Sequence, residues 1–538
     1  MPVSRFATPR ISVRLYKSIM RTTSDEGLSV SERYAGKEAF IDLTPFLGDG
    51  SSVTTTKGVR QPAGAFSITF ADRPNVAGSS MGPAVLDASL ETIYGLVEPM
   101  DIVEIRMWGG EGRCPNPMPI KMRGFVSSIT RRRTMAANGQ PQRTVVISGQ
   151  DYGKVLQTYQ ILFLPGYVGT SPLLTGYNMY ELFGDQQRNT ITAADFLKVM
   201  IEKVINPMLN TLIPPNSPMP RQITPDVQGV EGMLNNSYSN TEGSVLDLLN
   251  QHLDIGIWNE LFIEDREDGV YLVLRPVPAY DLQTGNSTQP LQVPAVIGTI
   301  PDNDIVQLEQ SRDDENVYNF YWVTANRFDL VDDMTRRLEA FSSTPGKHDP
   351  TVDMMDYSNS RYDYYGTRPL YADATLAPPD VTNMSGGLQP DAQESRAGDI
   401  VSWITDRRKV LNLNNKDNVV LEQGSMQVKG GPTRPASTEL LRAGDYVEVL
   451  DGVTSWMGYA FEISDNFAPY QSYSTSIRFD RGTGFAARVS ESSGHSPWLS
   501  DQATRRVEDI AGSEVDSRLV KATEWLKDPS SALNYFKG

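Results

Sequence analysis

The fold is decided by the stretch from Pro99 to Gly149, which opens with Met100-Asp101-Ile102-Val103-Glu104-Ile105, continues through Gly124-Phe125-Val126-Ser127-Ser128-Ile129 and closes with Thr144-Val145-Val146-Ile147-Ser148-Gly149. Polar and apolar residues alternate in each segment, and turn residues separate the segments. This pattern is typical of three consecutive antiparallel strands in a small barrel or sandwich.

A weaker copy of the same pattern returns more than three hundred residues later. It consists of Gly444-Asp445-Tyr446-Val447-Glu448-Val449, Gly458-Tyr459-Ala460-Phe461-Glu462-Ile463 and Ser474-Thr475-Ser476-Ile477-Arg478-Phe479. The order and the rough spacing agree with the first copy, although identities are few. The sequence therefore predicts two similar antiparallel β-barrels in one chain.

Length and composition bound the architecture. A chain of 538 residues is too long for a single hydrophobic core and should form three or four domains. With 43 Gly, 35 Pro and 39% hydrophobic residues, a β-rich and loop-rich protein is expected. The single cysteine, Cys114, excludes an internal disulfide framework and a multi-cysteine metal site.

The sequence shows neither a secretory signal nor a membrane-spanning segment. The N-terminal residues lack a basic segment followed by an apolar core, so no secretory signal is expected. No run of 18 apolar residues occurs, so no integral membrane segment is expected.

The formal net charge of −17 comes from 66 acidic and 49 basic residues. Such a surface repels nucleic acid, because phosphate binding needs clustered Lys and Arg. DNA that meets this protein should slide past it. The alternative is that the charge only keeps a large polar surface soluble.

The order of patterns along the chain predicts a mainly β protein with an α+β part. The first β-barrel takes residues 1–155, and its last two strands are joined through the turn dipeptide Asn138-Gly139. An α+β domain follows at 156–290, and a second β-barrel at 291–485 carries a Tyr-rich insertion at about 327–395. A helix at about 392–411 is expected to lead back to this barrel. A linker and a helical C-terminal tail occupy 486–538.

The α+β domain is predicted from helical periodicity followed by a hairpin. Residues 192–213 have helical spacing, with Thr192 and Asp195 resembling a capping box and Pro207 expected to kink or shorten the helix. A second helix is expected at about 244–253. The segments 259–264 and 270–276 then flank a turn at Asp268-Gly269.

Few residues suggest catalysis. The three histidines, His252, His348 and His495, are far apart in sequence, and Gly78-Ser79-Ser80-Met81-Gly82 lacks the preceding strand and following helix of a nucleophile elbow. The hairpin at 259–268 collects Glu260, Glu264, Asp265, Glu267 and Asp268. These acids could hold a metal or form an acid/base pair, but a solvated hairpin face is the favoured interpretation. We therefore predict no catalytic residue, no cofactor and no metal.

Two groups of residues are candidates for contacts with other proteins. Arg131, Arg132 and Arg133, with Arg143 across the hairpin, form the sharpest charge cluster. Residues on a strand alternate between its faces, so at most two of the three consecutive arginines should point one way. They could guard an edge strand against aggregation, face an acidic neighbouring chain or contact phosphate, and the neighbouring chain is favoured. The insertion contributes Tyr362, Tyr364 and Tyr365, which either bind a partner or belong to a disordered loop, and binding is favoured.

The order of these motifs resembles the hub proteins of contractile phage tail baseplates, of the late control D type. The resemblance rests on residues 99–105, the Gly124-Phe125-Val126 strand, the close at 146–153, Leu274-Arg275-Pro276, Gly444-Asp445-Tyr446-Val447 and Arg481-Gly482. It covers roughly residues 10–155 and 240–485. The insertion and the C-terminal tail have no counterpart in it.

The resemblance implies a structural protein without enzymatic activity. Hubs of this type are homotrimers whose two barrels per chain alternate around a ring, which matches a sixfold tail tube to a threefold central spike. The implied partners are the tail tube protein and the spike, then tape measure and peripheral baseplate proteins. DNA would pass through an acidic channel in the virion baseplate, which is assembled in the host cytoplasm. The rival functions are a tail-associated glycan hydrolase, using Glu260 and Glu264, and a receptor-binding protein using the Tyr-rich insertion.

Overall fold

The computed structural model describes residues 9–17, 40–48, 50–71, 93–109, 114–135, 141–161, 191–215, 217–234, 243–279, 298–325, 365–376, 390–434, 439–451 and 454–491. These residues fall into two compact units. Unit 1 comprises Met1–Val277, Gln427–Gly444 and Phe461–Ile477, and unit 2 comprises Pro278–Met426, Asp445–Ala460 and Arg478–Gly538. About half of the described residues lie in β-strands, as expected of a β-rich chain.

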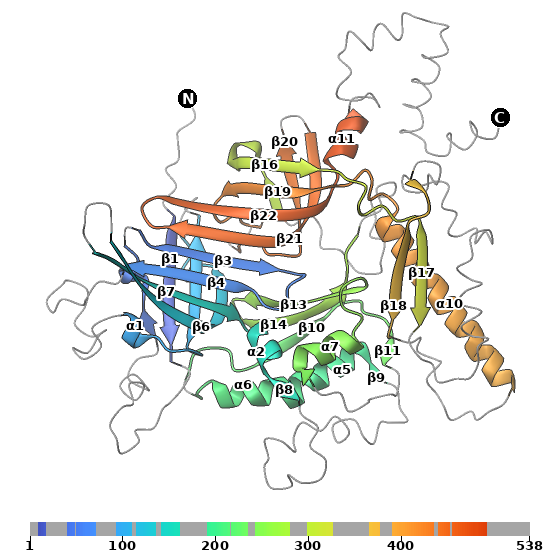
Figure 1. The fold of residues 1–538 in the computed structure, drawn as a ribbon, viewed down its shortest axis with the longest axis horizontal. Coiled ribbons are helices and arrows are strands. Elements are labelled where there is room, and N and C mark those ends of the chain that lie inside the picture. The colour runs from blue at the N-terminus through green and yellow to red at the C-terminus, as the bar shows by residue number, and fades with distance from the viewer. Residues whose placement is uncertain are drawn as a thin grey trace, which may run out of the picture. The chain divides into compact units, whose positions relative to one another are not determined.

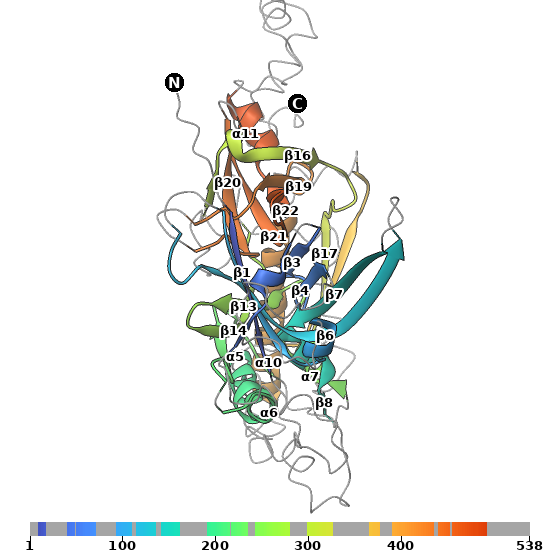
Figure 2. The same cartoon turned by 90° about the vertical axis from the view of Figure 1, so that its left-hand side faces the viewer.

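Unit 1 is built on a curled antiparallel sheet (Figures 1 and 2). Its main strands follow the order β1-β5-β6-β7-β4-β3. Their bounds are Arg10–Tyr16 (β1), Ser52–Gly58 (β3), Ala65–Ala71 (β4), Ile102–Trp108 (β5), Ile120–Met135 (β6) and Pro141–Asp151 (β7). The short strand β2, Ile41–Asp42, extends the sheet beyond β1.

Alternation explains why these residues form a sheet with one buried face. Side chains of a strand point alternately to its two faces, and Val13, Leu15, Ile68, Val145 and Ile147 all lie in one buried hydrophobic cluster. The three strands predicted between Pro99 and Gly149 are confirmed as β5, β6 and β7. The other edge of the sheet is extended by Glu462–Phe467 of β21, which pair with β3.

Unit 2 contains most of a second set of paired strands. Its order is β15-β20-β21-β22-β19-β16. The strands are Gly298–Ile300 (β15), Ile305–Ser311 (β16), Glu422–Lys429 (β19), Asp445–Asp451 (β20), Thr454–Ala468 (β21) and Ser472–Gly482 (β22). The last residues of β19 and β21 and the first residues of β22 belong to unit 1. The predicted second triplet is confirmed as β20, β21 and β22.

The two sets of strands repeat one order. If β1, β3, β4, β5, β6 and β7 are matched in chain order with β15, β16, β19, β20, β21 and β22, each neighbouring pair in the first set has its counterpart in the second. One difference is direction, because β1 is antiparallel to β5 whereas β15 is parallel to β20. Among the described strands no pairing joins the two ends of either set, so the sheet of unit 1 is a half-barrel.

The α+β part of unit 1 has the elements that periodicity predicted. A three-stranded sheet has the order β10-β14-β13, with bounds Ile223–Val227 (β10), Asn259–Arg266 (β13) and Gly269–Pro276 (β14). Beside it lie α5 (Ala193–Met200), α6 (Asn206–Leu212), α7 (Val245–His252) and α2 (Gly153–Thr158) (Figure 1). Short strands β8 (Gln160–Ile161) and β9 (Ile191–Thr192) pair with β12 (Gly243–Ser244) and β11 (Met233–Leu234).

The helix ends follow their caps. The Thr192 side chain accepts a hydrogen bond from the Asp195 backbone N–H, and Ser244 with Asp247 forms a complete capping box. The predicted 192–213 helix is interrupted by a π-helical turn at Ile201–Ile205, directly before Pro207. A π turn relieves the register conflict that proline causes in a helix.

Unit 2 also contains a parallel strand pair, β17 (Phe320–Ala325) and β18 (Pro369–Ala374), and two helices, α10 (Pro390–Asn415) and α11 (Gly484–Glu491). The helix expected near 392–411 is confirmed as α10, whereas α11 was not predicted. The Asn138-Gly139 turn, the Gly78–Gly82 motif and the tail beyond 491 lie outside the described residues, as does most of the 327–395 insertion. The four-domain division stays a prediction.

No helix in the described part of the chain is long and apolar enough to cross a membrane.

Candidate functional site: a basic β arm

The ends of β6 and β7 form a two-stranded extension of the unit 1 sheet. β5 pairs only with the first part of β6, up to Phe125, and β4 pairs with β7 only as far as Thr144. Among the described strands, residues 133–135 and 141–143 therefore pair only with each other, and Arg131 and Arg132 lie at the base of this extension. We call residues 131–135 and 141–144 the basic arm (Figure 2).

Register decides which arginines share a face of the arm. Arg133 lies opposite Arg143, Arg131 opposite Val145 and Arg132 opposite Thr144. Directly opposite residues of an antiparallel pair point to the same side, so Arg131, Arg133 and Arg143 share one face and Arg132 lies on the other. The prediction that at most two of the three consecutive arginines point one way is confirmed.

The arginines of the arm are exposed and mostly unpaired. The Arg131 guanidinium lies 5.9 Å from the ring centroid of Tyr94, a residue of α1 (Ile93–Leu96). Within the described part of the chain, Arg132, Arg133 and Arg143 make no hydrogen bond, ion pair or ring contact. Three cations in a chain of net charge −17 thus remain available to another molecule.

The tyrosine candidates fare differently. Tyr362 and Tyr364 lie outside the described residues. Tyr365 belongs to unit 2, and its backbone oxygen accepts a 3.1 Å hydrogen bond from Arg368 Nε. Nearby in the same unit, Tyr371 on β18 is 67% exposed, and its ring lies 6.4 Å from that of Trp322 on β17. The role of Tyr362, Tyr364 and Tyr365 as interface residues stays a prediction.

The acidic hairpin of β13 and β14 is only in part the solvated face that the sequence favoured, because Glu267 and Asp268 are exposed whereas Glu260 and Asp265 are buried. Asp265 is buried, and its Oδ2 lies 2.5 Å from Lys57 Nζ, which also contacts Asp151 Oδ2 at 3.2 Å. Burial by itself would lower the pKa of Lys57, but Asp265 and Asp151 outweigh it and raise that pKa, so the lysine stays charged. The solvated interpretation is therefore wrong for Asp265.

A second set of ion pairs joins the same hairpin to β5 and β6. Arg106 contacts Glu104 Oε1 at 2.7 Å and Glu267 Oε2 at 2.8 Å, and Glu267 Oε1 accepts from the Ile120 N–H at 2.7 Å. The buried Arg123 donates to the backbone oxygens of Arg266 and Gly269 at 2.8 and 3.2 Å. The hairpin is thus held on the sheet of unit 1 by charge-assisted hydrogen bonds.

Glu260 and Glu264, the residues required by a hydrolase mechanism, each form an ion pair with arginine. Glu260 Oε2 lies 3.2 Å from Arg275 Nε, and Arg275 also donates to the Gly444 oxygen at 3.0 Å. Glu264 contacts Arg442 and lies 2.8 Å from Arg266 Nη2. Burial would raise the pKa of Glu264, but the hydrogen bond from Arg266 and the charge of Arg442 outweigh it and lower this pKa to about 2. Such a carboxyl cannot serve as a general acid near neutral pH.

Sequence reasoning missed these ion pairs because their partners come from distant strands. One local signal existed: in β5, Glu104 and Arg106 are two residues apart in a run whose other members are apolar, and all seven residues of the strand are buried. Opposite charges on one face of a buried strand indicate an internal ion pair. Within the described residues, no group of three or more His, Cys, Asp or Glu could hold a metal ion.

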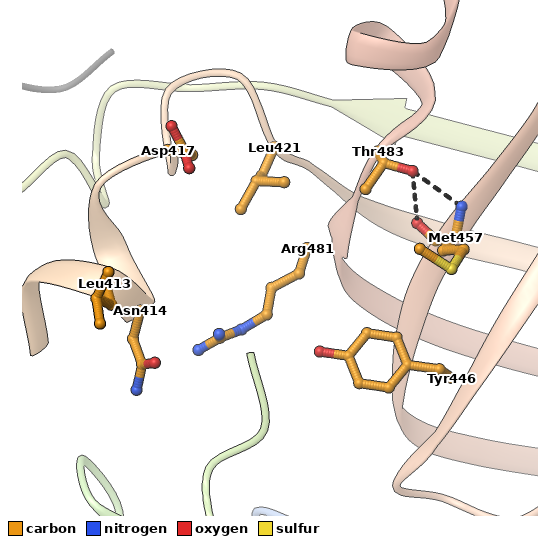
Figure 3. Close-up of a pocket in the computed structure, with 8 residues that line it drawn as sticks. All are labelled: Leu413, Asn414, Asp417, Leu421, Tyr446, Met457, Arg481 and Thr483. Atoms are coloured by element: carbon orange, nitrogen blue, oxygen red, sulfur yellow. Dashed lines mark hydrogen bonds between the residues drawn. The ribbon is translucent and has the colours of Figure 1, made fainter. Parts of the chain in front are cut away.

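Unit 2 has a small pocket of about 20 Å³ at the end of α10 (Figure 3). Arg481 points into it from β22, toward Asn414 and Tyr446, and has a positive φ of 54°. The Tyr446 hydroxyl donates to the Pro278 oxygen at 3.3 Å, and Thr483 bonds the backbone of Met457. This volume has room for about one water molecule, which indicates a solvated guanidinium rather than a substrate site.

No protein-family model matches the chain, and no curated protein matches it in sequence. Among solved structures it is similar to the tail protein from Neisseria meningitidis MC58, at 12% identity and a TM-score of 0.42, covering 89% of this chain and 98% of that one. It is also similar to the prophage MuSo2 tail protein from Shewanella oneidensis, at 10% identity and a TM-score of 0.40, covering 88% and 96%. A third is an E. coli type VI secretion system component, at 7% identity and a TM-score of 0.33, covering 80% and 73%.

Proposed function

We propose that this chain is a structural hub protein of a contractile phage tail baseplate, without enzymatic activity. The observation that carries the proposal is the repeated strand order, because one chain supplies two sets of strands with the same connectivity. The motif order that resembles late control D type hubs adds support from the sequence.

The repeat suits a ring that has two symmetries at once. Three chains with two similar barrel-type segments each would present six similar segments, so that a threefold assembly offers a nearly sixfold surface. In this proposal the sixfold surface meets the tail tube protein, and the threefold symmetry matches the central spike. Tape measure and peripheral baseplate proteins are further partners, and the protein is part of the virion, assembled in the host cytoplasm.

The charge of the chain suits a channel that DNA crosses. A net charge of −17 repels phosphates, so a lumen lined with carboxylates would let DNA pass without binding. The buried ion pairs favour a structural role over the hydrolase alternative, because Glu260 and Glu264 are both paired with arginine.

The proposed function is tested by the mass of the purified protein. The chain of 59.6 kDa should form a trimer at micromolar concentration, alone or with tube or spike protein. A strict monomer under all of these conditions would contradict the proposal. For the basic arm, Arg131→Glu with Arg133→Glu tests an inter-chain role, and intact ring assembly in this variant would exclude it.

Receptor binding is a second candidate because of the aromatic face on β17 and β18. The ring centroid of Trp322 lies 6.2 Å from that of Phe320 and 6.4 Å from that of Tyr371. Binding of the purified protein to host cell-surface glycan, lost in Tyr371→Ala, would support this function. Equal binding by the variant and the wild type would count against it.

A further inference from the structure

The strand order of unit 2 ends in β16, a partly exposed strand that lies within an acidic segment. β16 is the last strand in its order and, among the described strands, pairs only with β19. Residues 301–316, which include β16, contain six acidic residues and one arginine: Asp302, Asp304, Glu309, Asp313, Asp314, Glu315 and Arg312. We call residues 301–316 the acidic edge.

Some charges of the acidic edge are used inside unit 2 and others are free. Asp314 Oδ2 lies 2.6 Å from Arg368 Nη2, and the Arg312 guanidinium lies over the Phe485 ring at 3.5 Å. Asp302 and Glu309 are exposed and, within the described part of the chain, neither carboxylate makes an ion pair or hydrogen bond. The one arginine of the edge is therefore occupied while two carboxylates remain available.

The basic arm and the acidic edge are complementary in more than charge. Met135 at the end of the arm is 68% exposed, and Val306 on β16 is 65% exposed. An edge strand also presents unpaired backbone N–H and C=O groups, which are a ready template for another chain. Charged and apolar groups are thus present on both surfaces.

We propose that the basic arm of one copy docks on the acidic edge of a second copy of this chain. The inference rests on the proposed ring, because arm and edge are different surfaces and a head-to-tail contact between them generates a ring when the rotation closes. A second copy is favoured as the occupant because it supplies the acidic edge, and because Arg133 and Arg143 make no ion pair within the described part of their own chain. In the complex, Asp302 and Glu309 face Arg133 and Arg143 and relieve the repulsion between these two arginines.

Charge reversal tests the assignment on the full chain. The arm variant is Arg133→Glu with Arg143→Glu, the edge variant is Asp302→Arg with Glu309→Arg, and a third variant combines all four changes. Sedimentation should show that the wild type associates and that each reversed variant associates at least about tenfold more weakly, with salt weakening the wild type as well. The combined variant should associate again.

A matched control separates the effect of the arm residues on association from the effect of the change in net charge. Arg10→Glu with Lys198→Glu changes the net charge by the same amount at two exposed positions outside the arm. It should associate like the wild type. Thermal unfolding of every variant excludes loss of the fold as the cause.

The outcomes distinguish this inference from the function on which it rests. If the wild type forms trimers and the arm variant does so equally well, the arm contact is wrong and the hub proposal stands. If the arm variant fails and the combined variant fails too, the edge is not the acceptor, and the inference is overturned. If the wild type is a monomer throughout, the proposed function itself fails.

Discussion

Arg133 on β6 lies directly opposite Arg143 on β7, so two guanidinium groups share one face of a two-stranded arm. Like charges in this arrangement destabilise an antiparallel pair, by up to about 1 kcal/mol. Neither side chain has an ion-pair partner among the described residues. A pair that costs stability and is not compensated by any described residue suits a contact with another molecule, which is the proposed role of the arm.

Arg143→Gln should therefore stabilise the isolated chain while it weakens association. Removing one of the two like charges should raise the free energy of unfolding by a few tenths of a kcal/mol and at most about 1 kcal/mol. Urea unfolding measures the first effect and sedimentation the second. Arg132→Gln, on the opposite face of the arm, is the control and should not stabilise. A less stable Arg143→Gln chain would show that the side chain supports the fold.

Arg123→Met should detach the β13–β14 hairpin from the sheet of unit 1. The buried guanidinium holds two backbone oxygens of the hairpin and contacts Glu104 Oε2 at 3.3 Å, so its loss leaves these acceptors unpaired. Breaking a buried charge network of this kind costs about 3 to 5 kcal/mol. Arg132→Met, on the exposed part of the same strand, should change stability by no more than about 0.5 kcal/mol. Equal unfolding midpoints in urea would contradict the anchoring role.

The stability of unit 1 should fall in acid partly through Glu264. Its pKa is lowered from 4.5 to about 2, so the native state binds fewer protons than the unfolded state between these values. The contribution is complete above pH 4.5 and is lost as the pH falls toward 2, and it amounts to at most about 3 kcal/mol. Glu264→Gln should flatten the pH dependence of the unfolding free energy over this range. An unchanged slope would show that the ion pairs of Glu264 do not contribute.

Gly149→Ala should be strongly destabilising because the site has no room for a methyl group. A Cβ at this position would lie 2.2 Å from the Phe125 backbone oxygen and 2.4 Å from Phe66 Cζ. The backbone oxygen belongs to the paired strand β6 and cannot move without breaking the ladder, so a loss of at least about 1 to 3 kcal/mol is expected. Ser148→Ala, whose side chain bonds Ser128 on the exposed side, is the control for thermal unfolding.

Alternation along the chain predicted the repeated strand triplets, and helical spacing with a cap at Thr192 predicted α5. Helices were also expected at the positions of α7 and α10. These features depend on residues close together in sequence. The pairing of β3 with β21 joins residues about 400 positions apart, and neither strand carries a pattern that specifies the other. The partners of the acidic hairpin also lie on β3, β5, β6 and β7, which is why a buried ion network looked like a solvated face. For the basic arm, the sequence located the arginines, but only the register placed Arg133 against Arg143.

The proposal that two similar segments per chain build a ring of three chains is tested most directly by end-on electron micrographs of the purified protein. We predict averaged images with six similar outer densities around an open centre. Particles of a single chain, or a ring whose outer densities do not repeat six times, would contradict the account.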